Sequence, residues 1–263
     1  MWVGVGKGKG GAGCTVGALE LAYAATRRTR AGRPRRVGYI DLDPQGNATD
    51  VLEPASRAVG IKDVLAPTDP VPLAQAFVAT SWPNVSVAPA DRFLANREMD
   101  MTAEGLTVLR RARLSGEMDN QFDDIVIDLP RHLGRLSTAG LLGIEHLFIT
   151  ARPTLWGAQG AEEMRYTAQR ISYRGNPELM TSGFIVSGYE PGEDSDRIVG
   201  EMRKRFGRLL LSPPVPRREK VPEAIESYHT PCREYGDSAL VAVANAYQSF
   251  YDRTLALHSG EER

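Results

Sequence analysis

The 263-residue sequence has little cysteine, almost no net charge and no long apolar run. Its only cysteines, Cys14 and Cys232, form no CxxC pair, which predicts a reducing compartment and argues against a structural zinc site. The 32 basic and 33 acidic residues leave a formal net charge of −1, so charge alone indicates no partner. No segment approaches the roughly 20 apolar residues that cross a bilayer, and residues 2–6 run straight into a glycine-rich loop. We therefore expect a cytoplasmic protein without a membrane anchor.

Short apolar runs alternate with longer segments of helical pattern along the whole chain. Because these runs are continuously apolar, they predict parallel strands buried on both faces by helices. The predicted strands are 37–40, 85–88, 125–127, 147–149, 184–186 and 209–211, and the predicted helices are 15–29, 104–113, 136–142, 158–171, 194–206 and 238–257. The proline-rich stretch 53–83 predicts loops and short helices. The fold class is therefore α/β, a doubly wound and mostly parallel sheet, in a single domain over residues 1–263.

A glycine-rich loop, GKGGAGCT at 8–15, follows the strand-like residues 3–5 and opens a helix. It matches the phosphate loop GxxxxGK[ST] everywhere except at the lysine. Glycines let successive backbone N–H groups turn toward one anion, and the helix N-terminus behind them adds a favourable dipole. The predicted phosphate-binding residues are Gly10, Gly11, Ala12, Gly13, Cys14, Thr15 and Val16.

Carboxylates follow two of the predicted strands. Asp41 and Asp43 begin the segment DLDPQGNAT at 41–49, and Asp128 begins DLP at 128–130. Ligands of an open parallel sheet lie beyond the carboxyl ends of its strands, so all three carboxylates are expected to converge on the glycine-rich loop.

With KGGAGCT at 9–15, DLDPQGNAT at 41–49 and DLP at 128–130, the sequence resembles the ParA/MinD family of deviant Walker ATPases. The similarity continues through GIKDVL at 60–65, PNVSVAPA at 83–90 and VPR at 215–217, and the segment at 41–49 favours the ParA branch. The resemblance implies a P-loop NTPase fold that binds ATP or ADP with Mg²⁺.

The resemblance also implies individual roles. Lys9 would be the signature lysine that reaches the partner's phosphates across a nucleotide-sandwich dimer, and Asp43 would orient the attacking water, so these two are the implied catalytic residues. Thr15, Asp41 and Asp128 would hold the magnesium, the aspartates mostly through its waters. Such roles agree with phosphoryl transfer, in which the protein mainly positions groups and neutralises charge.

Cys14 stands where the family has the lysine that bridges the phosphates, and a thiol offers no positive charge. Losing one such donor commonly costs on the order of 10²–10³ in rate, so we expect a weak ATPase that needs partner stimulation, unless Lys7 or Lys9 substitutes. Two other interpretations stay open: a site without turnover, and a reactive thiol whose pKa is lowered at a helix N-terminus. Arg131 is a second departure, because the family usually repeats proline there.

Two basic sets suggest a polyanionic partner. One spans residues 27–36, and the other includes Arg217, Arg218 and Lys220, the predicted DNA-binding residues. Nonspecific phosphate contacts need clustered cations and no base-reading motif. The alternative is that both sets are solvated faces balanced by nearby carboxylates. The tail 257–263 is too short and acidic to resemble the membrane-binding helix of MinD.

The sequence thus predicts a ParA-like ATPase for DNA partition or cargo positioning. It would form an ATP-dependent homodimer, bind DNA nonspecifically on the nucleoid and respond to a ParB-like stimulating protein. The alternative is a catalytically impaired nucleotide-binding or constitutive DNA-binding scaffold. The cargo stays undetermined.

Overall fold

The computed structural model describes residues 1–8 and 10–260. Its centre is an eight-stranded sheet in the order β10-β9-β8-β1-β7-β4-β6-β5, parallel throughout except for the edge pair β5 and β6. The strands are β1 (Trp2–Lys7), β4 (Val37–Asp41), β5 (Val78–Ala79), β6 (Val85–Ala88), β7 (Asp124–Asp128), β8 (His146–Ala151), β9 (Met180–Tyr189) and β10 (Val215–Pro216). A separate hairpin pairs β2 (Thr29–Arg30) with β3 (Arg33–Pro34).

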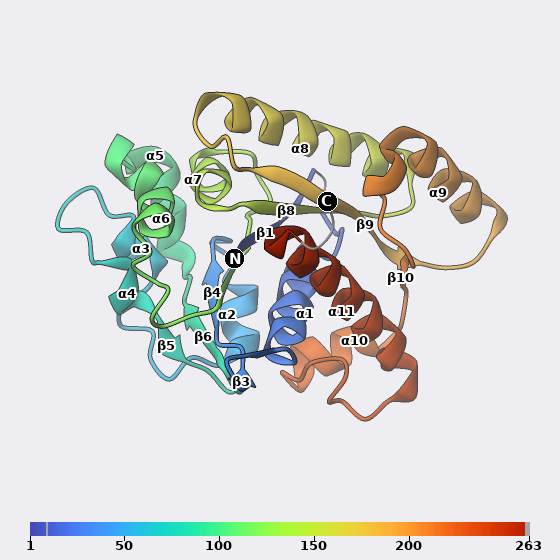
Figure 1. The fold of residues 1–263 in the computed structure, drawn as a ribbon, viewed down its shortest axis with the longest axis horizontal. Coiled ribbons are helices and arrows are strands. Elements are labelled where there is room, and N and C mark those ends of the chain that lie inside the picture. The colour runs from blue at the N-terminus through green and yellow to red at the C-terminus, as the bar shows by residue number, and fades with distance from the viewer. Residues whose placement is uncertain (9, 261–263) are drawn as a thin grey trace.

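Helices cover both faces of this sheet, as Figure 1 shows for α8 and α9 on one side and α1 and α11 on the other. The helices are α1 (Cys14–Thr26), α2 (Asn47–Leu52), α3 (Ile61–Val64), α4 (Leu73–Ala76), α5 (Arg97–Asp100), α6 (Ala103–Ser115), α7 (Arg135–Gly143), α8 (Leu155–Arg174), α9 (Glu193–Phe206), α10 (Lys220–Pro222) and α11 (Ser238–Ser259). Short turns of 3₁₀ helix occupy Arg92–Asn96 and Gly207–Leu209, and a π-helical turn occupies Glu223–Ser227.

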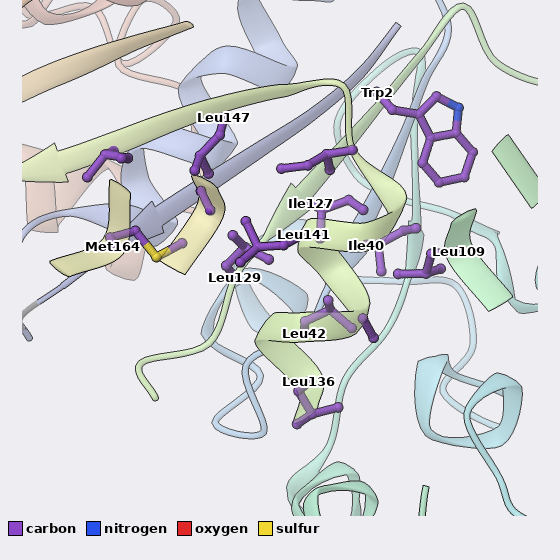
Figure 2. Packing of buried hydrophobic residues seen from close by; sticks show 14 of the residues in the cluster. Trp2, Ile40, Leu42, Leu109, Ile127, Leu129, Leu136, Leu141, Leu147 and Met164 are labelled. Atoms are coloured by element: carbon purple, nitrogen blue, oxygen red, sulfur yellow. The ribbon is translucent and has the colours of Figure 1, made fainter. Parts of the chain in front are cut away.

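The sheet separates two apolar cores, because side chains alternate between the faces of a strand. In β7, Ile125 and Ile127 face the α6, α7 and α8 side, whereas Val126 faces α1 and α11. Figure 2 shows the first core, where Leu109, Leu129, Leu141 and Met164 pack together from separate elements. Continuous apolar strands thus serve two helical layers, as predicted.

Five of the six predicted strands and all six long helices are present, and 53–83 forms only short elements. The strand predicted at 209–211 is wrong. Residues 207–209 form a 3₁₀ turn, and Leu210 makes a single bridge to Phe184. Pro213 and Pro214 follow at once and cannot donate ladder hydrogen bonds, so the edge strand is delayed to β10. The first helix also ends earlier than predicted, at Thr26 rather than Thr29.

In the part of the chain that the structure describes, no helix combines the length and the apolarity needed to cross a membrane.

Candidate functional site

The glycine-rich loop joins β1 to α1 at the carboxyl edge of the sheet. Gly11 and Gly13 have positive φ angles of 74° and 70°, a backbone conformation that residues with a Cβ rarely adopt. Gly13 is the N-cap of α1, so the helix begins at Cys14 with its free N–H groups directed into the loop. Lys9, the implied catalytic lysine, lies outside the described residues.

Residues far away in the sequence hold the loop from its outer side. Ser187 Oγ donates to the Ala12 carbonyl at 2.6 Å, and Arg152 Nε donates to the Gly11 carbonyl at 3.1 Å. Gly8 lies against α8 so closely that a Cβ there would be 1.6 Å from the Gly160 carbonyl oxygen. Sequence reasoning missed Ser187 and Arg152, because neither belongs to a motif and only the folded sheet brings them to the loop.

The predicted carboxylates do converge on this edge. Asp41 and Asp128 end the neighbouring strands β4 and β7 and are directly paired in register. Asp41 is fully buried and accepts hydrogen bonds from the Asp43 N–H at 3.1 Å and from the Thr49 N–H and hydroxyl at 2.9 and 2.8 Å. Thr49 is the last residue of the 41–49 segment, and its two hydrogen bonds fix the position of the Asp41 carboxylate.

Asp128 is less well satisfied than Asp41. Its Oδ1 lies 3.3 Å from Cys14 Sγ, while its Oδ2 is buried and has no hydrogen-bond partner among the described residues. Burial raises the pKa of Asp128 to about 6, although the Thr15 hydroxyl and the Lys7 ammonium both lower it. Burial and the Asp128 carboxylate together raise the pKa of Asp41 to about 7. Two carboxyl groups in one dry site thus resist simultaneous ionisation.

This carboxylate pair fits a magnesium ion. Mg²⁺ prefers oxygen ligands, keeps several of its waters and binds to proteins through one or two carboxylates together with substrate phosphates. Asp41, Asp128 and the Thr15 hydroxyl supply such oxygens, and the unpartnered Asp128 Oδ2 is an acceptor that a hydrated cation would satisfy. Among the described residues, no three His, Cys, Asp or Glu side chains are grouped as direct metal ligands.

Asp43 lies at the mouth of the site and is also largely buried. Its Oδ1 accepts from the Gln45 N–H at 3.0 Å, and its Oδ2 lies 3.5 Å from Arg131 Nε. Arg131, the residue that departs from the family pattern, is half exposed. Its contact with Asp43 connects the loop after β7 to this carboxylate.

Cys14 is buried at the base of the loop. Its Sγ lies 3.1 Å from the Val5 carbonyl oxygen, 3.3 Å from Asp128 Oδ1 and 3.8 Å from the Leu129 carbonyl oxygen, so the thiol proton has three acceptors. Burial, followed by the Asp128 carboxylate, raises the pKa of Cys14 well above its usual range. The interpretation of Cys14 as a reactive thiol is therefore wrong, because desolvation outweighs the helix N-terminus.

Lys7 is a candidate to provide the positive charge that Cys14 does not supply. It is only 6% exposed and follows Val3 and Val5 on the face of β1 that packs toward α1 and Cys14. Its ammonium lowers the pKa values of both Cys14 and Asp128, which places its charge within their shared pocket. The side chain of Lys7 is in no ion pair within 4.0 Å in the described chain.

A groove of about 540 Å³ adjoins the loop and is lined by Gly11, Gly13, Val16 and Arg152 together with residues 187, 188, 215–219, 221, 222, 226, 243 and 247. It extends the phosphate loop by a space with both apolar and charged walls. Of these residues, Gly11, Gly13 and Val16 were predicted to bind phosphate, and Arg217 and Arg218 to bind DNA.

The predicted DNA-binding residues lie beside that groove. Arg217 and Arg218 line it, and Lys220 lies at a neighbouring hollow. Arg217 pairs with Glu190 at 3.1 Å, Lys220 pairs with Asp237 at 3.0 Å, and Arg218 donates to the Ala239 carbonyl at 3.2 Å. Carboxylates thus neutralise Arg217 and Lys220 in part, whereas the described chain offers Arg218 only carbonyl acceptors and leaves its full charge beside the loop.

The first basic set, residues 27–36, is mostly paired inside the molecule. Arg28 pairs with Asp252, Arg33 with Asp123 at 2.6 Å, and Arg35 with Asp124 at 2.6 Å. This arrangement favours the balanced-face interpretation for the first set.

The loop, its helix and the carboxylates at neighbouring strand ends define a phosphate-loop nucleotide-binding domain. A family model of the AAA domain matches residues 2–181. The chain is 28% identical over 221 residues to the chromosome partitioning protein ParA of Caulobacter vibrioides, which covers 82% of this chain and 80% of that protein. It is 27% identical over 222 residues to the sporulation initiation inhibitor protein Soj of Bacillus subtilis, with 82% and 84% covered.

A solved structure has the same fold over the whole chain. Cobyrinic acid a,c-diamide synthase from Mycobacterium smegmatis, with bound ADP and magnesium, is 26% identical with a TM-score of 0.79, covering all of this chain and 96% of its own. The chain belongs to the AAA domain family and to the ParA/MinD family of P-loop ATPases.

Proposed function

We propose that this chain is a ParA-like partition or positioning ATPase that binds ATP and Mg²⁺ at the glycine-rich loop. The observation that carries the proposal is the buried pair Asp41 and Asp128, in which Asp128 Oδ2 has no partner among the described residues, beside a loop of positive-φ glycines. A hydrated magnesium would supply the positive charge that this pair lacks, and the triphosphate would bind to the loop N–H groups. The ParA and Soj relatives, together with the ADP- and magnesium-bound structure, support the choice of ligands.

Each residue then has a defined task. The loop N–H groups bind the phosphates, Thr15 and the two aspartates orient the metal through its oxygen ligands, and bound Mg²⁺ neutralises charge on the phosphates. Asp43 would accept a hydrogen bond from the attacking water at the mouth of the site and so position it. Arg131 restrains Asp43 in the free protein, and its release would be one way in which nucleotide binding alters the loop after β7.

Lys7 is the residue that we assign to the charge normally supplied at position 14. Cys14 is neutral, because its pKa is raised, and its side chain is too short to leave the base of the loop. The ammonium of Lys7 is buried on the same face of β1, and a phosphate facing it would offset the desolvation cost of that charge. We therefore expect nucleotide affinity to be retained better than turnover.

Dimerisation around the nucleotide completes the proposal. Leu155 and Trp156 are 61% and 74% exposed in the first turn of α8, close to the loop that Gly160 contacts. Large apolar side chains exposed beside a ligand loop suit a protein interface. Lys9 would then act across that interface, while Arg217, Arg218 and Lys220 would contact DNA nonspecifically and keep the dimer on the nucleoid. A ParB-like protein would stimulate hydrolysis.

The second candidate function is a nucleotide-dependent or constitutive DNA-binding scaffold without turnover. The neutral, buried thiol of Cys14 favours it, because position 14 then supplies no cation to the phosphates.

The first experiment is calorimetry with ATP and ADP, with and without Mg²⁺, on the native chain and on Asp43→Ala and Cys14→Lys. We expect magnesium-dependent ATP binding by all three, no turnover by Asp43→Ala, and at least tenfold higher affinity or turnover for Cys14→Lys. No binding by the native chain at millimolar nucleotide would contradict the proposal. Binding without turnover in Cys14→Lys would favour the scaffold.

A further inference from the structure

We infer that the chain has a second anion site, distinct from the glycine-rich loop, in a groove between α6, α7 and α8. We name it the arginine groove and define it by Arg110, Arg170 and Arg174 above the apolar floor of Leu142 and Ile171. Its volume is about 480 Å³, which lies within the range of small-molecule pockets, roughly 300–1,000 Å³. Figure 1 shows α6, α7 and α8 on the same face of the sheet.

The charge of the groove is unbalanced. No carboxylate lines it, and none of the three guanidinium groups has an ion pair or hydrogen-bond partner among the described residues. Arg110 Nε is buried and lacks a partner. Two arginines on the neighbouring helical surface are paired instead, Arg113 with Glu178 and Arg205 with Glu162. The groove therefore gathers three cations without a neutralising carboxylate among the described residues.

The three guanidinium groups of the arginine groove lie where their like charges repel one another. Arg170 and Arg174 are four residues apart on α8, where like charges repel, and Arg110 of α6 lines the same groove. The three threonines of the wall donate their hydroxyl protons to their own helices, at the carbonyls of Ala103 or Glu104, Gly134 and Glu163. The guanidinium groups are thus the only strong donors that face the groove from the described chain.

These features select the ligand class. Guanidinium forks match the oxygens of a phosphate group bidentately, and an apolar floor accommodates a ring or a chain. The site therefore fits a phosphorylated small molecule of about mononucleotide size. It is separate from the loop site, because Arg174 is the last residue of the 20-residue α8, whose first turn lies beside the loop. A helix of that length spans roughly 30 Å.

Hydrogen exchange resolved by peptide, with inorganic pyrophosphate and AMP as probes, separates the two sites. We expect slower exchange at residues 103–115 and 163–175 in the native chain. We expect that protection to disappear, and the calorimetric affinity of that site to fall at least tenfold, in the variant Arg170→Gln with Arg174→Gln. Both side chains are exposed, so this double variant should fold. Arg110→Gln adds the half-buried arginine of the groove in a second variant.

The matched control is Arg165→Gln with Arg203→Gln, which removes two arginines that do not line the groove and should preserve the protection. Protection confined to residues 8–16, or equal losses in the groove and control variants, would overturn the proposal. ATP binding at the loop is read from residues 8–16 in the same experiment, so failure at one site does not imply failure at the other. Protection by a DNA duplex or an acidic peptide, but by neither probe, would overturn the ligand class.

Discussion

The two ends of β7 carry the same side chain in opposite conditions. Asp124 begins the strand and receives Arg35 at 2.6 and 3.0 Å, the Tyr251 hydroxyl at 2.9 Å and the N-terminal amine at 3.7 Å. Asp128 ends the strand, where its Oδ1 lies 3.3 Å from the Cys14 thiol and its Oδ2 has no partner among the described residues. One end of the sheet is electrostatically complete within the chain, and the other is not.

The neighbouring pKa values follow the same division. The Arg33 guanidinium and the Arg36 N–H outweigh burial and lower the pKa of Asp123 to about 2, whereas the pKa values of Asp41 and Asp128 are raised to about 7 and 6. Burial opposes ionisation at both ends, but only the amino end provides the cations that overcome it. Buried carboxylates without an ion pair among the described residues mark the edge at which a ligand cation would bind.

The largest expected effect is a loss of stability when the ion pair at the amino end of β7 is broken. We expect Arg35→Ala to lower the free energy of unfolding by about 3–5 kcal/mol, because it leaves Asp124 buried without its main cation. Urea unfolding measures this loss. The control is Arg57→Ala, which breaks an exposed pair with Asp50 and should cost no more than about 1 kcal/mol. Equal effects of the two variants would contradict the comparison.

A histidine at the same end gives the next largest effect. Burial, followed by His258, lowers the pKa of His146 to about 4, against about 6.5 in an unfolded chain. Between these values the unfolded state binds a proton that the native state does not, so the contribution of His146 to stability falls as pH falls from about 6.5 to 4. The raised pKa values of Asp41 and Asp128 act in the opposite direction over this range, so the His146 contribution is read as the difference between the native chain and His146→Gln. The expected change in that difference is on the order of 2–3 kcal/mol, measured by urea unfolding at several pH values.

His146→Gln should gain stability relative to the native chain as pH falls from about 6.5 to 4, whereas His132→Gln, at an exposed position after β7, should not. A difference between the native chain and His146→Gln that is constant over this pH range would refute this account.

The carboxyl end should respond in the opposite sense. Asp128→Asn removes an ionised group whose raised pKa makes its charge costly above about pH 6. In the absence of nucleotide at pH 8, we expect the variant to be about 1–2 kcal/mol more stable than the native chain while losing magnesium-dependent ATP affinity. Thermal unfolding and calorimetry test the two parts, and a destabilised Asp128→Asn would show that this carboxylate is structural.

Lys7 gives the smallest and most specific effect. Lys7→Gln should weaken ATP binding about tenfold, equivalent to about 1.4 kcal/mol, while Lys204→Gln on the exposed face of α9 should not. In a Cys14→Lys background the same Lys7→Gln change should cost less, because the loop then has its own cation. Equal costs in both backgrounds would remove Lys7 from the phosphate site.

Much of this site was predictable because its residues are adjacent in sequence to strong signals. Asp41 and Asp128 follow continuous apolar strands, and the rule that such ends meet at one edge is enough to bring them together. Gly11 and Gly13 were predictable from the conformations that a phosphate loop requires. The condition of Cys14 was not, since its pKa depends on burial under Val5 and Asp128 rather than on its position in the helix.

The remaining parts depend on contacts between distant segments. Ser187 and Arg152 hold the loop through backbone carbonyls, which carry no sequence signal. The arginines at 27–36 formed one basic cluster in the sequence, but their partners Asp123, Asp124 and Asp252 are more than 80 residues away. The arginine groove likewise combines residues from three helices. Local pattern identified the nucleotide edge, and tertiary pairing determined which charges are available.

The burial of both cysteines has a practical consequence for studying motion in this protein. Since Cys14 and Cys232 are its only thiols and neither reaches the surface, the native fold offers no ready target for maleimide reagents. A single cysteine introduced at Tyr173, which is 91% exposed, would be labelled selectively without deleting either natural residue. Slow modification of Cys14 itself would then report how often the loop above it opens, so this buried thiol provides a built-in probe of loop movement.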